Sequence, residues 1–292
     1  MSDKGENRMK LSVIVPAYNE EKIIGDVLDG LKKVLGEGGH DAEIIVVDDG
    51  SIDGTSRLAQ SKGVRVVRHE KNYGYGAALK TGIRAAGSGH ILIVDGDGSY
   101  PLDDIPELLR DCDKYDMVIG ARTKTGAAMS LMRNIAKSFL GKLAEYLVKE
   151  RIPDINSGLR VFTKSMYEEY KRILPDGFSF TMTITLASMS ARKNVRFVPI
   201  GYRKRKGISK IRPIHDTLGF FLLIIRTILL FNPLRVFMPV AALFFIAAAG
   251  LAVYSINVVG RFMDVSVTLL FVFGAQIIIL GFIADLINRR VD

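Results

Sequence analysis

The chain has 292 residues, of which 48% are hydrophobic, and it carries a formal net charge of +9. Its mean hydropathy of +0.21 is high for a protein that is soluble throughout. The single cysteine, Cys112, excludes an internal disulfide, so no oxidising compartment is required. The positive charge fits a phosphorylated substrate, an anionic lipid or a nucleic acid as partner.

Residues 1–9 are polar and predict a flexible N-terminus without a cleavable signal peptide. Residues 10–212 alternate between short apolar runs and segments with helical periodicity. We expect helices after Asn19 as N-cap, from Thr55 onward, at 77–86 and at 101–111. The predicted strands lie at 11–15, 43–47, 64–67, 90–94 and 116–120. This order predicts an α/β, Rossmann-like domain whose mostly parallel sheet has helices on both faces.

Acidic residues follow three of the predicted strands. The first strand runs into the segment 16–20, the second into Asp48 and Asp49, and the fourth into Asp95 and Asp97. Ligands of parallel α/β sheets bind at this edge. Carboxylates crowded there repel one another unless a cation compensates them, and Mg²⁺ or Mn²⁺ prefers oxygen ligands together with substrate phosphates. We therefore predict a divalent-cation site at Asp95 and Asp97, with a plain polar turn as the alternative.

Other chemistry-bearing motifs do not fit this sequence. An EF-hand loop starting at Asp95 would need Gly and Glu where Tyr100 and Pro106 stand. The glycine-rich stretch 72–76 lacks the third glycine of a dinucleotide fingerprint, and no Walker loop or HExxH motif is present. The four histidines are scattered, so a histidine metal site is not expected.

The last quarter of the chain predicts a membrane hairpin (residues 234–292) after a juxtamembrane amphipathic helix at 213–233. Residues 236–259 carry no charge, and residues 265–287 carry only Asp285. Both are long enough to cross a bilayer, although two buried helices of a soluble core are the alternative. Basic residues flank the hairpin on both sides, which predicts that the domain at 10–212 and both termini lie on the cytoplasmic face.

Four motifs, in order and each on its predicted element, resemble the family 2 glycosyltransferases with a GT-A fold. They are LSVIVPAYNEE (11–21), VVDDGSIDGT (46–55), NYGYGAALKTG (72–82) and VDGDGSYP (94–101). With the hairpin, four later pieces resemble the dolichol-phosphate mannose synthase and polyprenyl-phosphate glycosyltransferase branch. These are GAR (120–122), MRN (132–134), NSGLRVF (156–162) and RKGISK (205–210).

The resemblance implies a role for each matching residue. The cation, Mg²⁺ or Mn²⁺, would be held by Asp95 and Asp97, with Ser99 standing where the family often has a glutamine ligand. The nucleotide sugar would contact Pro16, Tyr18, Glu20, Asp48, Asp49, Lys80, Gly96, Arg203, Arg205, Lys206 and Lys210. The acceptor would contact Arg122, Arg133, Ser157 and Ser209, and the catalytic residues would be Asp95, Asp97, Arg122 and Arg133.

The segment 178–191, where related enzymes often place a catalytic carboxylate, contains no acid. A phosphate acceptor needs no general base, because its second pKa near ~6 leaves it largely ionised at neutral pH. Arginines that position it are present instead. The resemblance therefore implies transfer of a hexose, with mannose favoured, from a nucleotide-diphosphate sugar to a polyprenyl phosphate in a bilayer, with inversion. GDP-mannose is the favoured donor, and a UDP-sugar is the other.

Several alternatives stay open beside this interpretation. The transferred sugar could be glucose or an N-acetylhexosamine, or the domain could be a non-catalytic membrane scaffold. A processive polysaccharide synthase is disfavoured because the chain has no tryptophan for the Gln-x-x-Arg-Trp motif. A nucleic-acid partner explains the charge but not the hairpin, so we expect none. A homo-oligomer is compatible with the sequence.

Overall fold

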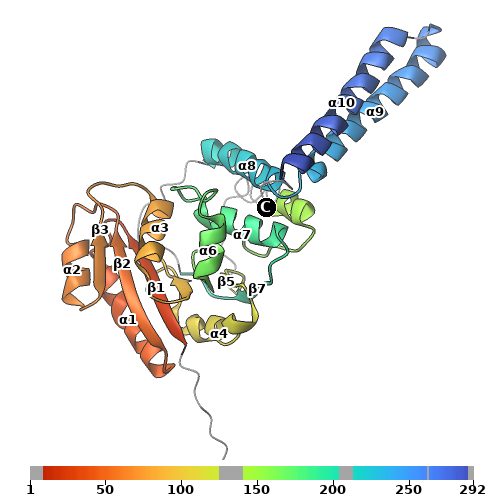
Figure 1. Cartoon of the computed structure of the whole chain (residues 1–292). Helices are drawn as coiled ribbons and strands as arrows, with labels where there is room; N and C mark the ends of the chain where they lie inside the picture. The colour runs from red at the N-terminus through yellow and green to blue at the C-terminus, as the bar shows by residue number, and fades with distance from the viewer. Residues whose placement is uncertain (1–8, 125–140, 204–212, 262, 289–292) are drawn as a thin grey trace, which may run out of the picture.

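The structure, a computed structural model, describes residues 9–124, 141–203, 213–261 and 263–288 (Figure 1). In this part of the chain, seven strands form one sheet in the order β3-β2-β1-β4-β6-β5-β7. β6 runs antiparallel to both of its neighbours, whereas every other pair is parallel. The strands are β1 (Lys10–Ala17), β2 (Asp41–Asp48), β3 (Arg65–Arg68), β4 (His90–Ile93), β5 (Met117–Ala121), β6 (Arg160–Thr163) and β7 (Val195–Pro199).

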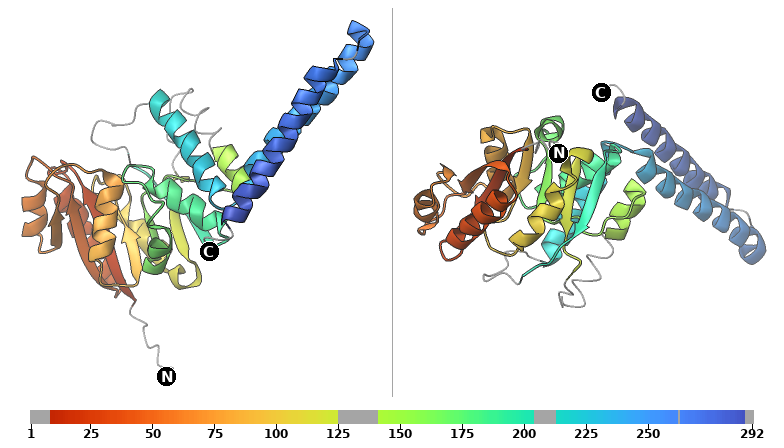
Figure 2. Two further views of the ribbon diagram at one scale, coloured as in Figure 1. Left: turned by 45° about the horizontal axis from the view of Figure 1, so that its top comes forward. Right: turned by 90° about the horizontal axis from the view of Figure 1, so that it is seen from below.

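Helices cover both faces of the sheet (Figures 1 and 2). One face packs against α1 (Ile24–Glu37), α2 (Thr55–Ser61) and α4 (Ile105–Leu109) in a first apolar core. The other face packs against α3 (Tyr75–Ala85), α6 (Lys164–Tyr170) and α7 (Phe180–Ser190) in a second core. Alternate residues of β1 point to the two cores, Val13 and Val15 to the first and Ile14 to the second. A strand buried on both faces has to be apolar throughout, which explains why these runs do not alternate with polar residues.

The predicted mostly parallel α/β architecture is confirmed, and β1 to β5 lie within two residues of the five expected strands, whereas β6 and β7 were not predicted. The predicted N-cap at Asn19 is wrong, because α1 begins five residues later and Asn19 adopts a left-handed φ of 57°. The predicted helix at 101–111 is a 3₁₀ turn over Leu102–Asp104 followed by the short α4. Pro106 in the first turn of α4 lacks the N–H that would extend the helix backwards.

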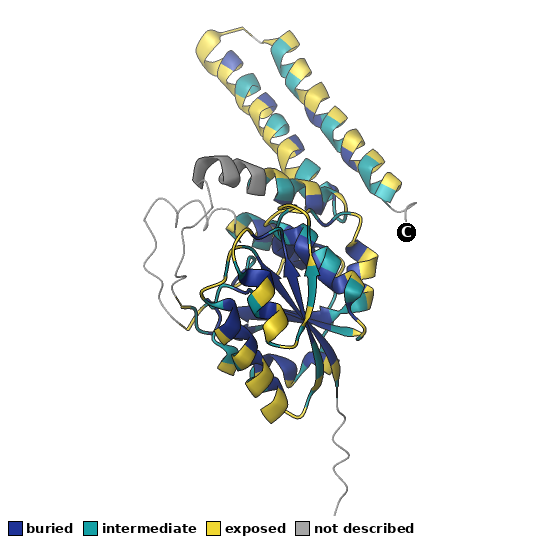
Figure 3. Cartoon of the chain, turned by 90° about the vertical axis from the view of Figure 1, so that its left-hand side faces the viewer, coloured by how far each residue is buried: buried dark blue, intermediate teal, exposed yellow. Residues whose placement is uncertain are grey.

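The C-terminal segment forms a hairpin of α9 (Leu234–Tyr254), one π-helical turn (Ser255–Val259) and α10 (Asp264–Asn288). It projects away from the sheet domain (Figure 1) and exposes most of its apolar side chains (Figure 3). Residues 234–259 and 264–288 are both long and apolar enough to cross a membrane. The alternative of two buried helices in a soluble core is therefore wrong for this hairpin.

Small residues line the contact between the two hairpin helices. Ala241 and Ala248 of α9 are buried one heptad apart, and so are Gly274 and Gly281 of α10. A Cβ on Gly274 would lie 2.9 Å from the ring of Phe245, so this ring packs directly on the glycine backbone of the other helix. Close approach over small residues is how helices pair in lipid, where the hydrophobic effect does not drive them together.

The helix α8 (Pro213–Leu229) links the sheet domain to the hairpin. Its residues Ile224 and Ile228 are fully buried in a third apolar core, together with α7 and the helical residues 141–148. Leu222 on its other side is 58% exposed. The predicted amphipathic character of this segment is thus present, but its buried face packs on the catalytic domain.

Candidate active site

The loops that follow β1 and β2 are joined by hydrogen bonds. The backbone N–H groups of Asn19 and Glu20 donate to the hydroxyls of Ser51 at 2.9 Å and Thr55 at 2.8 Å. Asn19 Oδ1 accepts a backbone N–H of the second loop in return, at 3.0 Å. These bonds hold the two loops side by side. Tyr18 and Glu20, both predicted to bind the nucleotide, are half-buried in the first loop.

The two acids that end β2 are compensated within the protein. Asp48 is fully buried and accepts the Ser51 N–H at 2.9 Å. Asp49 is also buried and accepts the N–H groups of Tyr73 and Gly74, each at 2.9 Å. Within the described residues no group of three His, Cys, Asp or Glu could hold a metal, so Asp48 and Asp49 do not add a third acid to the predicted cation site at Asp95 and Asp97. A nucleotide contact by either acid stays a prediction that its burial does not favour.

Asp95 lies between a tyrosine hydroxyl and a glycine backbone. Tyr75 donates its phenolic O–H to Asp95 Oδ1 at 2.8 Å. Burial, together with the nearby Asp95 charge, raises the pKa of Tyr75 well above its ordinary value, so the phenol remains a donor. The Gly158 backbone also approaches this carboxylate, since a Cβ on Gly158 would lie 2.5 Å from Asp95 Oδ2. Only glycine permits the chain to pass this close to the carboxylate.

Asp97 and Ser99 lie in the turn after β4. Asp97 Oδ1 accepts the Ser99 N–H at 3.0 Å, and the Ser99 carbonyl accepts the Arg203 N–H at 2.9 Å. The turn also contacts β1, because the Gly96 N–H donates to the Pro16 carbonyl at 3.3 Å. Arg203, the first of the basic residues predicted to contact the nucleotide sugar, is thereby held beside the acidic turn.

The donor set of this turn fits a hard divalent cation. Asp95 and Asp97 supply carboxylate oxygens, which Mg²⁺ and Mn²⁺ prefer. The Ser99 hydroxyl is 1% exposed, and its oxygen has no hydrogen-bond partner within the described part of the chain. Buried polar atoms nearly always have a partner, so this oxygen has bonding capacity left for a ligand.

The glycine-rich loop before α3 packs against the loop before α7. The Ala77 N–H donates to the Asp176 carbonyl at 3.0 Å, and Lys80 Nζ lies 2.7 Å from the Asp176 carboxylate. Lys80 is therefore held in a structural ion pair, which does not favour its predicted contact with the nucleotide. The same packing stacks the Phe178 ring on Tyr75, with the ring centroids 5.7 Å apart.

Arg122, predicted to bind the acceptor, is bound by an acid of its own chain. Its Nε and Nη2 donate to the Asp154 carboxylate at 2.6 and 2.8 Å. The bidentate pair raises the pKa of the Arg122 guanidinium above its ordinary value despite the burial that acts against it. The guanidinium also lies over the Tyr202 ring, 5.1 Å from its centroid. Of its three nitrogens, Nη1 makes none of the hydrogen bonds recorded among the described residues.

Arg160 is a buried guanidinium that the sequence analysis did not select, although it lies in the quoted NSGLRVF motif. It is fully buried and donates to the carbonyls of Ser157 and Thr181 and to the Thr185 hydroxyl. Its signal in the sequence is a charge at the start of a short strand, directly before Val161 and Phe162. Ser157 is itself fully buried, and like Ser99 its hydroxyl oxygen has no hydrogen-bond partner among the described residues, so its contact with the acceptor stays a prediction.

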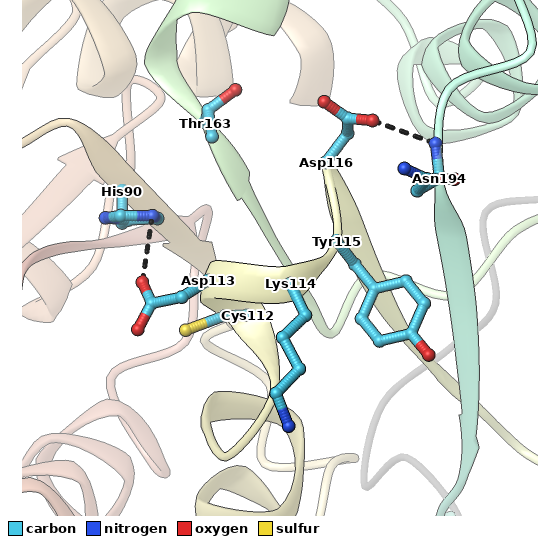
Figure 4. A pocket seen from close by; sticks show the side chains of 8 residues that line it. All are labelled: His90, Cys112, Asp113, Lys114, Tyr115, Asp116, Thr163 and Asn194. Atoms are coloured by element: carbon cyan, nitrogen blue, oxygen red, sulfur yellow. Dashed lines mark hydrogen bonds and ion pairs between the residues drawn. The ribbon is translucent and has the colours of Figure 1, made fainter.

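The remaining predicted residues lie outside the described part of the chain. They are Arg133, Arg205, Lys206, Ser209 and Lys210. A shallow polar hollow does appear in the structure, between His90, Asp113 and Asn194 (Figure 4). It lies at the amino ends of the parallel strands, opposite the acidic turn, and is therefore not part of the candidate site.

Comparison with known families supports this reading of the chain. Residues 12–171 match the family described as Glycosyl transferase family 2, and residues 232–289 match the GtrB C-terminal hairpin. A dolichyl-phosphate hexose transferase of Haloferax volcanii is 31% identical over 70% of this chain and 87% of its own length. A dolichyl-phosphate beta-glucosyltransferase of Dictyostelium discoideum is 29% identical over 71% of this chain and 70% of its own length.

A solved structure of similar fold is glucosyl-3-phosphoglycerate synthase of Mycobacterium tuberculosis in complex with Mn²⁺, UDP-glucose and phosphoglyceric acid. It is 21% identical with a TM-score of 0.59, covering 76% of this chain and 80% of that one. At this identity the likeness concerns the fold, and it confirms the GT-A architecture that the motifs predict.

Proposed function

Because the chain belongs to glycosyl transferase family 2 and ends in a GtrB C-terminal hairpin, we propose that it transfers a hexose from a nucleoside-diphosphate sugar to a polyprenyl phosphate. The relatives named above act on dolichyl phosphate. The sequence motifs favour mannose, and the relatives' names give hexose and glucose, so GDP-mannose and UDP-glucose are both candidate donors. Direct displacement would invert the anomeric carbon and give a β-linked product from an α-linked donor.

The observation that carries this proposal is the acidic turn at the carboxyl end of β4. This turn is hydrogen-bonded to Arg203, the first of the basic residues at 203–210 that are predicted to contact the nucleotide sugar. The Arg203 N–H bond to the Ser99 carbonyl brings the two together. The donor diphosphate is negative and needs both a cation and basic groups around it, since charge grows on it as the sugar leaves. Asp95, Asp97 and the Ser99 hydroxyl are the residues that would hold Mg²⁺ or Mn²⁺. That ion would act as a Lewis acid on the leaving diphosphate.

The acceptor side of the proposal rests on the absence of a base where one would be needed. Residues 178–191, which include the described helix α7, contain no carboxylate. A sugar hydroxyl acceptor would lack a general base there, whereas a phosphate monoester brings its own negative charge. Arg122 Nη1 and Arg133 are the proposed contacts to that phosphate, because guanidinium groups match phosphate oxygens.

The hairpin gives the enzyme its membrane location in this proposal. Residues 234–259 and 264–288 would cross the bilayer, which keeps the catalytic domain beside its lipid substrate. Basic residues in 203–212 and at Arg289 and Arg290 flank the two helices on one side. The positive-inside rule places that side, with the catalytic domain, in the cytoplasm.

The activity is tested with membranes that contain the full chain, a polyprenyl phosphate, Mn²⁺ and radiolabelled donors, by measuring label that enters the lipid phase. We expect transfer from GDP-mannose or UDP-glucose, and a loss of at least roughly 100-fold in Asp97→Ala, since even outer partners of metal ligands matter 10–100-fold. Asp113→Ala, an exposed acid of the opposite sheet edge, is the matched control and should retain activity. Full activity of Asp97→Ala would contradict the cation site, and no lipid product from any nucleotide sugar would contradict the function.

A further inference from the structure

We propose that Tyr75 is a positioning residue that orients Asp95 for the cation, an inference that rests on the proposed function of this turn. The phenolic O–H donates to Asp95 Oδ1 at 2.8 Å. Tyr75 comes from the glycine-rich loop that opens α3, so the contact joins two motifs that lie 20 residues apart in the sequence. Neither motif alone indicates it.

The Tyr75 ring is itself fixed in place. Phe178 stacks on it at 5.7 Å with an interplanar angle of 14°. The backbone on either side packs closely against the loop 175–177, because a Cβ on Gly74 would lie 2.6 Å from the Asp176 carbonyl and one on Gly76 would lie 2.3 Å from the Pro175 carbonyl. A hydroxyl on a ring held this firmly can define the direction of its acceptor.

Asp95 also lies against the Gly158 backbone. That backbone passes so near that a Cβ there would lie 2.5 Å from Oδ2 and 2.7 Å from Oδ1. Gly158 is held by its own N–H, which donates to the Tyr100 hydroxyl oxygen at 2.6 Å. The hydrogen bond from Tyr75 and this close backbone contact together restrict rotation of the carboxylate.

This arrangement suits a cation ligand. Each carboxylate oxygen offers two lone pairs, so a hydrogen bond from Tyr75 orients Asp95 without removing it as a ligand. Orienting the carboxylate in advance removes part of the ordering cost that cation binding would otherwise carry. A tyrosine that merely packs in the fold would have no influence on the cation, and the two interpretations therefore differ in a measurable way.

The test is a titration of Mn²⁺ into the full chain in detergent, with saturating UDP or GDP, in which electron paramagnetic resonance counts free Mn²⁺. Tyr75→Phe keeps the ring that stacks on Phe178 and removes only the hydroxyl. We expect its Mn²⁺ dissociation constant to rise roughly 10-fold. The matched control Tyr73→Phe removes a phenol in the same loop that is 49% exposed, and it should bind Mn²⁺ as the unchanged protein does. Binding by Tyr75→Phe within twofold of the unchanged protein would overturn the inference.

Two further measurements separate the outcomes. Thermal unfolding without Mn²⁺ is recorded for each variant to show that it is folded. If folded Tyr75→Phe has the same Mn²⁺ dissociation constant as the unchanged protein, the inference is overturned, whatever the stability of the variant. If the unchanged protein transfers sugar to lipid but Tyr75→Phe binds Mn²⁺ normally, the inference fails and the proposed function stands. If Tyr75→Phe binds Mn²⁺ 10-fold more weakly while no lipid product forms, the proposed function fails and the positioning role stands. The same titration is made with Asp97→Ala, which should lose the Mn²⁺ site. If the unchanged protein binds no Mn²⁺, or if Asp97→Ala binds it equally well, the inference is overturned.

Discussion

Arg160 is a buried charged side chain whose hydrogen-bond partners in the described structure are all neutral. Its direct partners are the Ser157 and Thr181 carbonyls and the Thr185 hydroxyl, with no carboxylate among its recorded bonds. Burial lowers the pKa of Arg160 to about 10, partly offset by the surrounding tyrosines and acids. The group is still charged at neutral pH. It links the loop before β6, which passes Asp95, to the first turn of α7.

Replacing Arg160 by lysine should destabilise the protein by about 2–3 kcal/mol. An ammonium cannot form the planar fork that reaches both the Ser157 carbonyl and α7, so buried oxygens lose charged hydrogen bonds. The measurement is the free energy of unfolding in denaturant, for the full chain in detergent. Arg196→Lys is the control, because that arginine forms a more exposed pair with Asp111 whose loss should cost less than about 1 kcal/mol. Equal stability of both variants would contradict a structural role for Arg160.

At the scale of elements, apolar runs predicted the parallel strands well. The segments at 11–15, 43–47 and 90–94 lie in β1, β2 and β4, because a strand buried on both faces has few polar positions that could mislead. β7 was not predicted from the sequence, and neither was β6. It is four residues long, begins with the charged Arg160 and runs antiparallel, and its place in the sheet depends on contacts with two other strands.

The residues of the candidate site also differ in how far the sequence could predict them. Asp95 and Asp97 could be identified from the sequence, because strand ends and paired acids are local features. The contacts of Tyr75 with Asp95, Arg122 with Asp154 and Lys80 with Asp176 join distant segments, and only packing brings them together. The family resemblance gave Arg122 and Lys80 roles in substrate binding, and it did not indicate that the fold pairs each of them with an acid.

The packing of the glycine-rich loop against the segment 175–178 makes a test at this scale. Gly76→Ala would place a Cβ 2.3 Å from the Pro175 carbonyl and force the two loops apart. We expect a loss of about 1–3 kcal/mol in the free energy of unfolding, as for other overpacked sites, and a fall in transferase activity because Tyr75 moves with the loop. Gly177→Ala is the matched control, since its Cβ would meet nothing within 4 Å. A Gly76→Ala variant as stable and active as the control would show that the two loops separate freely.

At the scale of the whole molecule, α8 connects two parts with different surroundings. Its buried face completes the third core with α7, and its end leads into α9 and the hairpin. Phe231 after α8 also packs on Tyr170 of α6, with the ring centroids 6.0 Å apart. From this packing we propose that the catalytic unit extends beyond the predicted boundary at residue 212 and includes α8.

Two truncations test this boundary. A chain that ends at residue 232 keeps Ile224 and Ile228 in the third core and should unfold in one cooperative transition. A chain that ends at residue 212 loses both, which removes roughly 3–6 kcal/mol of burial and exposes Met182 and Leu186 of α7. Since domains are stable by only about 5–15 kcal/mol, the shorter chain should aggregate or unfold at much lower denaturant. Far-UV circular dichroism in denaturant and size-exclusion chromatography measure both effects. Equal stability of the two chains would return the boundary to residue 212 and leave α8 as a separate juxtamembrane helix.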